Sequence, residues 1–236
     1  MAKTTAQPAP FTGFQPEALQ FLADLAANND RAWFQPRKAD YERLIKLPLE
    51  ALCVALAERF AALDLPLRAD PKRSPFRIYR DVRFSKDKSP YKTAQGADFP
   101  WLGLSAADGP APRGAVGGYF HFEPGNIFVG GGMWHPEPAR LAAFRERIDR
   151  DPEAVLRAIE DDRFRSVFGS VTGDSLTRNP RGFSADHPYS YLLRLKDVVF
   201  SRRLADRDVY SKKLPDLIAQ DLDAACPVLR FLDGLA

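Results

Sequence analysis

The sequence predicts an α+β protein with an antiparallel or mixed central sheet and flanking helices. Three features of the 236 residues lead to this prediction: helical apolar periodicity near both ends, strand-like runs in the middle, and the absence of a repeated strand–helix alternation. Helices that precede and follow a group of strands are typical of this class, whereas a parallel sheet would need a helix between successive strands.

The N-terminal part favours helices. Residues 16–28 begin with a proline suited to a first helical turn and carry leucines at helical spacing. Asn29 or Asp30 is expected to cap a second helical stretch, with a break or kink at Pro48. Beyond that proline an apolar stripe consists of Leu49, Leu52, Cys53, Leu56 and Phe60. The proline-rich stretch 63–76 is expected to be extended.

The middle of the chain favours strands. Residues 76–84 alternate between apolar and polar side chains, which predicts a strand, although Arg80 falls on its apolar face. Residues 85–90 have turn composition, and residues 98–117 read as a loop rich in glycine, proline and alanine. The next segment predicts a β-hairpin around a Glu-Pro-Gly-Asn turn. Gly130–Gly132 is expected to end its second strand, and a backbone anion nest there is the weaker interpretation.

The C-terminal part favours helices around one more strand. A helix is expected to start at Pro136, and Asp151 is expected to cap another that begins at Pro152 and is followed by a short helical turn. Residues 187–196 predict a short helix, and residues 197–204 predict a strand. The last helix is expected over 211–235 with a bend near Pro227.

Length and composition favour one domain over residues 11–236, after a flexible tail at residues 1–10. Hydrophobic residues make up 45% and charged residues 28%, and no apolar run approaches the length of a membrane span, so no membrane association is expected. The N-terminus has no signal or transit pattern. Cys53 and Cys226 lie in helical surroundings that suit free thiols, which favours the cytoplasm.

Positive charge is concentrated in one segment. Residues 68–92 contain nine Lys or Arg against three Asp, while the net charge of the whole chain is +3. The core of this segment is RIYRDVRFSKDKSPYKT, residues 77–93. Such asymmetry indicates an anionic partner, whereas the nearly neutral total argues against strong nonspecific binding to duplex DNA.

The candidate ligand-binding residues are Arg77, Arg80, Arg83, Lys86, Lys88, Tyr91 and Lys92. Each charge-assisted hydrogen bond contributes about 1.5–3 kcal/mol when partly desolvated, so two or three suffice for micromolar binding of an anion. The equally weighted alternative is that Asp81, Asp87 and other carboxylates neutralise these cations. Arg80 needs a partner because its neighbours on that face are apolar, and a protein carboxylate is favoured over a ligand.

His121 and Glu123 alternate onto one face of the predicted hairpin, with Tyr119 two residues earlier. They are the candidates for acid–base catalysis. The chain has three histidines, and neither cysteine lies near another ligand type, so neither a metal site nor a cofactor is expected. It contains no Walker, Gly-x-Ser-x-Gly or His-Glu-x-x-His motif.

Five stretches resemble a known family in the same order: FTGF, NNDRAWFQPRKADYE, RIYRDVRFSKDKSPYKT, YFHFEPGNIFVGGGMW and NPRGFSADHPYSYLLRLK. The chain resembles the family known as domain of unknown function 2461 from about Phe11 to its C-terminus. The resemblance implies one domain over nearly the whole chain, and it implies no activity, cofactor or catalytic residue. The chain departs from the family mainly in the loop near residues 102–116.

Three hypotheses about function stay open. The leading one is a domain that binds a phosphate-bearing ligand or a nucleic-acid segment through residues 77–92. The second is a small-molecule enzyme with His121 and Glu123 as the acid–base pair, and the third is a structural or protein-interaction domain without a small ligand. The sequence does not decide whether the protein is an enzyme, and it names no protein partner.

Overall fold

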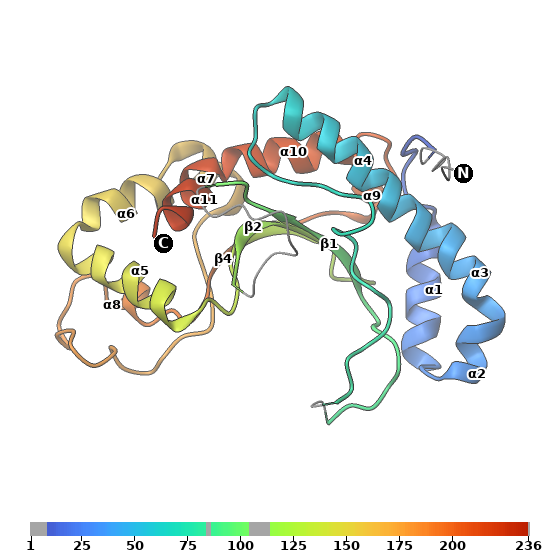
Figure 1. Ribbon diagram of the computed structural model, residues 1–236, viewed down its shortest axis with the longest axis horizontal. Coiled ribbons are helices and arrows are strands. Elements are labelled where there is room, and N and C mark those ends of the chain that lie inside the picture. The colour runs from blue at the N-terminus through green and yellow to red at the C-terminus, as the bar shows by residue number, and fades with distance from the viewer. Residues whose placement is uncertain (1–8, 84–85, 104–113, 236) are drawn as a thin grey trace, which may run out of the picture.

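The computed structural model of the protein describes residues 9–83, 86–103 and 114–235 (Figure 1). The strands are β1 Gln95–Pro100, β2 Val116–Phe122, β3 Phe128–Met133 and β4 Val198–Arg203. The N-terminal helices are α1 Pro16–Ala27, α2 Arg31–Phe34, the 3₁₀ turn Gln35–Arg37, α3 Lys38–Tyr41, the π turn Glu42–Lys46 and α4 Leu47–Ala62. The later helices are α5 Pro138–Arg150, α6 Pro152–Ile159, α7 Asp162–Phe168, α8 Ser190–Leu193, α9 Asp206–Val209, α10 Leu214–Ala224 and α11 Cys226–Asp233.

The four strands form one antiparallel sheet in the order β1-β2-β3-β4. This arrangement confirms the predicted α+β class, and β2 and β3 form the predicted hairpin. Strand β1 was not predicted, and the expected loop at 98–117 is wrong at both ends because Asp98–Pro100 lie in β1 and Val116 and Gly117 lie in β2. In QGADFP only Ala97 and Phe99 carry the apolar alternation, which is a weak local signal, so its pairing with β2 defines this strand. Residues 104–113 of that expected loop lie outside the described residues.

One face of the sheet is covered by helices. Helices α4, α10, α11 and α7 pack on it, and Figure 1 shows α4, α10 and α11 above the strands. The side chains on this face include Phe99, Phe120, Phe122 and Phe200, each at most 2% exposed. Phe14, which precedes α1, stacks on Phe122 with ring centroids 4.4 Å apart. Most of the hydrophobic core therefore lies between the sheet and these helices.

The other face of the sheet is polar and less deeply buried. The strand register places Asp98 opposite Tyr119, and Gly96 opposite His121. His121 is also paired with Phe128 of β3, the strand on the other side of β2. In Figure 1 helices α1–α3 stand beside the β1 edge, and α5 and α8 stand on the β4 side. The described helices therefore flank this face instead of lying across it.

The predicted N-terminal helices are largely confirmed. The side chain of Asp30 accepts a hydrogen bond from the Trp33 amide at 2.8 Å, which makes it the cap of the second helical stretch. Of the expected break or kink at Pro48, the break is wrong, because the backbone stays helical through this position. A π turn over Glu42–Lys46 lies directly before α4, and Pro48 is the second residue of α4.

The glycine triplet Gly130–Gly132 lies within β3, a central strand, and does not end it. A Cβ atom at Gly132, where φ is +115°, would collide with the carbonyl oxygen of Val198 in β4. Close approach of two strand backbones therefore explains this glycine. The nest interpretation is wrong, because the triplet is paired in the sheet and the next helix begins only at Pro138.

The C-terminal elements largely agree with the sequence expectations, but α5 begins at Pro138 instead of the expected Pro136, and the short helix α9 was not predicted. Asp151 caps α6 by accepting a hydrogen bond from the Ala154 amide at 3.2 Å, and β4 spans most of the predicted strand. The final helical stretch is divided into α10 and α11, with Pro227 in the first turn of α11. Both cysteines are free, Cys53 buried and Cys226 half-buried. No helix in the described parts of the chain is long and apolar enough to span a bilayer. The single domain over 11–236 and the cytoplasmic location stay predictions.

Candidate functional site: a cationic arm beside a polar sheet face

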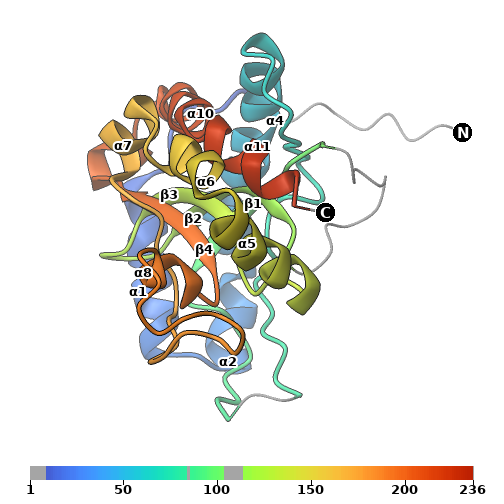
Figure 2. The ribbon, with the colours of Figure 1, turned by 90° about the vertical axis from the view of Figure 1, so that its left-hand side faces the viewer.

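The basic segment forms an irregular two-stranded ribbon, which we call the cationic arm (described residues 74–83 and 86–96). The Phe76 amide donates to the Gly96 carbonyl at 2.9 Å, and the Lys92 amide donates to the Ile78 carbonyl at 2.7 Å. Only isolated bridges form, so the regular strand predicted for residues 76–84 is wrong. Pro75 and Pro90 remove amide donors from the ribbon, which prevents a continuous ladder. Figures 1 and 2 show the arm projecting from the body below the sheet.

The predicted alternation of side chains nevertheless holds over part of the arm. Arg77, Tyr79, Asp81 and Arg83 are exposed, whereas Ile78 is 4% exposed and the Arg80 side chain 27%. Phe76 departs from the pattern, because it is 39% exposed instead of buried with the apolar set. Phe84 lies outside the described residues.

The base of the arm is anchored to the N-terminal helices through Tyr91. The Asn29 side chain donates to the Tyr91 carbonyl at 3.0 Å and accepts from its amide at 3.1 Å. The Tyr91 ring is 1% exposed and stacks on Phe34 with centroids 4.1 Å apart. Tyr91, which the sequence suggested as a ligand-binding residue, therefore holds the arm in place.

Two of the arginines form ion pairs within the arm. Arg80 pairs with Asp87, which confirms that its partner is a protein carboxylate. Arg83 pairs with Asp81 at 2.7 Å, and its hydrogen bonds lower the pKa of Asp81 to about 2. The Arg80 Nε is buried and has no hydrogen-bond partner among the described residues, so Asp87 satisfies only one side of this guanidinium.

Other cations of the arm have no carboxylate partner in the described parts of the chain. Arg77 and Lys86 are exposed and form no ion pair there, while Lys88 donates to the Val82 carbonyl at 2.9 Å. Lys92 is half-buried, and its Nζ lies 5.1 Å from the centroid of the Phe76 ring. Burial lowers the pKa of Lys92, and the nearby charges of Arg77 and Arg80 lower it further. Lys92 is therefore a partly buried cation whose charged neighbours, Arg77 and Arg80, are also cations.

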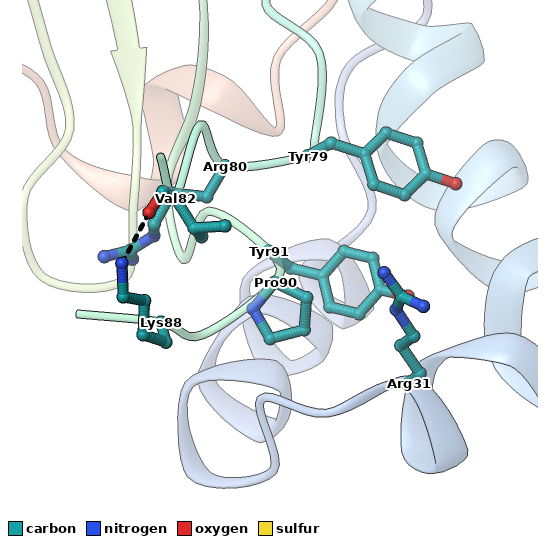
Figure 3. A pocket seen from close by; sticks show the side chains of 7 residues that line it. All are labelled: Arg31, Tyr79, Arg80, Val82, Lys88, Pro90 and Tyr91. Carbon is teal, nitrogen blue, oxygen red and sulfur yellow. Dashed lines mark hydrogen bonds between the residues drawn. The ribbon is translucent and has the colours of Figure 1, made fainter. Parts of the chain in front are cut away.

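Two pockets include Arg80 in their lining. The first, of about 340 Å³, is lined by Arg31, Tyr79, Arg80, Val82, Lys88, Pro90 and Tyr91 (Figure 3). The second, of about 450 Å³, is lined by Arg77, Tyr79, Arg80, Asp81, Val82, Arg83 and Lys92. Figure 3 shows the Arg80 and Lys88 side chains at one end of the first pocket, and Arg31 beside Tyr91 at the other. Each pocket therefore contains several cations, and the second contains one carboxylate.

A hydrogen-bonded chain of side chains crosses the polar face of the sheet. Tyr119 Oη lies 2.8 Å from His121 Nδ1, and His121 Nε2 lies 3.1 Å from Glu123 Oε2. Asn126 donates to the same Glu123 oxygen at 3.1 Å. The Phe128 ring stacks on the imidazole with centroids 4.7 Å apart. The pair predicted from the sequence is thus brought together, and Tyr119 extends it.

The charge of Glu123 determines which groups donate and which accept in this series of hydrogen bonds. Burial raises the pKa of Glu123, but hydrogen bonds from Asn126 and His121 outweigh that effect and lower the pKa. An ionised carboxylate only accepts, so His121 Nε2 carries the proton, and in the neutral imidazole Nδ1 accepts from the Tyr119 hydroxyl. Both imidazole nitrogens are engaged. Tyr119 is therefore the group through which His121 would act on a substrate.

Phe76 connects the arm to this face. The centroid of its ring lies 5.8 Å from that of Tyr119, and the Lys92 ammonium group lies over the same ring. Sequence reasoning missed Phe76, Arg31 and Asp98 as members of the site. Asp98 lies opposite Tyr119, and burial raises its pKa. Arg31 gave no signal, because an arginine in a helical turn is commonplace, and Asp98 was hidden in the unpredicted strand β1.

The remaining histidines lie elsewhere. His135 contacts Asp197 and His187 contacts Asp149, at 3.3 Å and 3.5 Å. Within residues 9–83, 86–103 and 114–235, no three His, Cys, Asp or Glu side chains gather closely enough to hold a metal ion.

Fold and site together define an α+β protein whose cationic arm lies beside a polar sheet face. The chain belongs to the DUF2461 family of conserved hypothetical proteins, whose sequence profile matches residues 17–231. The match spans all the described helices and strands except the first residue of α1 and the last two of α11. Comparison with curated proteins and with solved structures gives no significant match.

Proposed function

We propose that the protein binds a phosphate-bearing anion at the cationic arm, in the pocket lined by Arg77, Arg80 and Lys92. The observation that carries this proposal is the half-buried Lys92, which has two cationic neighbours and no carboxylate partner among the described residues. Partial burial of a cation is unfavourable unless an opposite charge compensates for it. An anion in this pocket would supply that charge.

The arm is suited to such a ligand for two further reasons. Guanidinium groups bind phosphate oxygens with paired hydrogen bonds, and the Arg80 Nε is a buried donor without a partner in the described structure. The second pocket, at about 450 Å³, has room for a phosphate or pyrophosphate group. Its single carboxylate, Asp81, is already paired with Arg83, which reduces its repulsion of an anion.

A thermal-shift experiment with pyrophosphate tests this proposal. Wild-type protein is expected to be stabilised by about 2.7 kcal/mol at 100 times the dissociation constant, equivalent to a rise in Tm of about 5–10 °C. Lys92→Met keeps the contact with Phe76 and removes the charge, so its shift should be strongly reduced. Lys212→Met, at an exposed lysine in the turn before α10, is the matched control. Equal shifts in both variants would place any binding outside the arm.

The hydrogen-bonded chain Tyr119–His121–Glu123 favours a second candidate function, acid–base catalysis on the anion that the arm holds. A general base oriented by a carboxylate and bonded to a hydroxyl is the arrangement that activates a nucleophile. Turnover of p-nitrophenyl phosphate, bis(p-nitrophenyl) phosphate and p-nitrophenyl acetate by wild type, His121→Ala and Tyr119→Phe tests it. Loss of turnover in both variants supports catalysis, and turnover indifferent to His121 removes this assignment.

A further inference from the structure

The two pockets of the arm share a wall made by Tyr79, Arg80 and Val82. Different cations complete the two linings: Arg31 and Lys88 in the first pocket, Arg77 and Lys92 in the second. A single phosphate group occupies one pocket only. A ligand that carries successive phosphates along a chain can place one in each.

Tyr79 is an exposed aromatic residue that lines both pockets. Its exposed fraction is 53%, and the buried Tyr91 supports it with ring centroids 5.6 Å apart. Exposed tyrosines that border cationic pockets are suited to stacking with nucleobases, because each base presents a flat π-face. Neither a free phosphate nor a polyphosphate would use this ring.

We propose that the arm binds single-stranded nucleic acid, with phosphates in the two pockets and a base stacked on Tyr79. The inference rests on the proposed function and names its ligand class. A duplex is disfavoured because its bases are already stacked and its charge calls for a wider cationic surface than one arm of a chain with net charge +3. An acidic peptide would satisfy the cations but would leave Tyr79 without a stacking partner.

The test is fluorescence anisotropy with a labelled twelve-residue oligothymidylate and with an abasic strand of the same length and charge. Wild type is expected to bind the oligothymidylate more tightly than the abasic strand. Tyr79→Leu should weaken oligothymidylate binding by about fivefold to a hundredfold and leave abasic binding unchanged. Tyr79→Trp should retain it. Tyr191→Leu, at a tyrosine that is 58% exposed elsewhere on the surface, is the matched control.

The outcomes separate this inference from the proposed function. Equal affinity for the two strands, or no effect of Tyr79→Leu in a variant with an unchanged Tm, overturns the nucleic-acid inference and leaves anion binding intact. Competition by polyglutamate as effective as that by oligothymidylate also overturns it, in favour of an acidic peptide. Failure of both strands and of pyrophosphate to bind overturns both proposals.

Discussion

Replacing Asn29 with alanine tests how the arm is held against the helices. The Asn29 side chain makes two part-buried hydrogen bonds to the backbone of Tyr91, at 3.0 and 3.1 Å. Its removal leaves one amide and one carbonyl without this partner. Each such loss costs about 1–3 kcal/mol when the group is buried, and water that enters a part-buried site recovers some of that cost. We therefore expect a loss of about 2 kcal/mol, which lowers Tm by about 4–8 °C.

Asn28→Ala is the matched control for this change. Its side chain donates to the Asp24 carbonyl at 2.9 Å, but that bond is exposed and lies within one helix end. Calorimetry should show a smaller loss than for Asn29→Ala, about 0.5 kcal/mol. Limited trypsin digestion should also cut the arm of the Asn29 variant faster, because the ribbon is rich in lysine and arginine. Equal Tm values and equal cleavage rates for the two variants would refute the assigned anchoring role of Asn29.

Three other predictions concern the body of the protein. Gly132→Ala should destabilise it by about 1–3 kcal/mol more than Gly125→Ala, measured by denaturant unfolding, because both have positive φ but only the first would add a collision with β4. The pKa of Glu123 is lowered from its ordinary 4.5, so its stabilising contribution is present above that pH and lost as the pH falls through the folded pKa. Wild type should therefore lose more stability than Glu123→Gln on acidification below about pH 5, and parallel curves would contradict this. Burial raises the pKa of both thiols, to about 11 for Cys226, so native protein should react slowly with a disulfide reagent at pH 8, and at Cys226 before the fully buried Cys53.

The sequence predicted elements whose signals are local. Proline in a first helical turn, an aspartate cap such as Asp151 and the Glu-Pro-Gly-Asn hairpin turn act within a few residues, and each lies where it was expected. Strand β1 and the glycine triplet were misassigned because pairing with neighbouring strands decides them. Gly132 lies in a strand because the backbone of β4 approaches it closely, and its own sequence neighbourhood does not record that approach.

The site shows the same division. Alternation along the chain was sufficient to place Arg80 on the inner side of its segment and to put His121 and Glu123 on one face. It was not sufficient to show that Arg83 pairs with Asp81 while Lys92 is half-buried. The half-burial of Lys92 depends on its packing against Phe76, which is 16 residues away in the sequence. A charge count treats all six cations of the segment alike, whereas the structure distinguishes those with carboxylate partners from those without one among the described residues.

The most direct test of the central claim is a calorimetric titration of pyrophosphate into wild type and into the double variant Arg77→Gln/Lys92→Met. The Lys212→Met variant serves as the control. We expect one binding event in wild type and in the control, weakened by added salt, and at least a tenfold loss of affinity in the double variant, equivalent to about 1.4 kcal/mol. Undiminished affinity in a folded double variant would contradict the claim that the cationic arm is an anion-binding site.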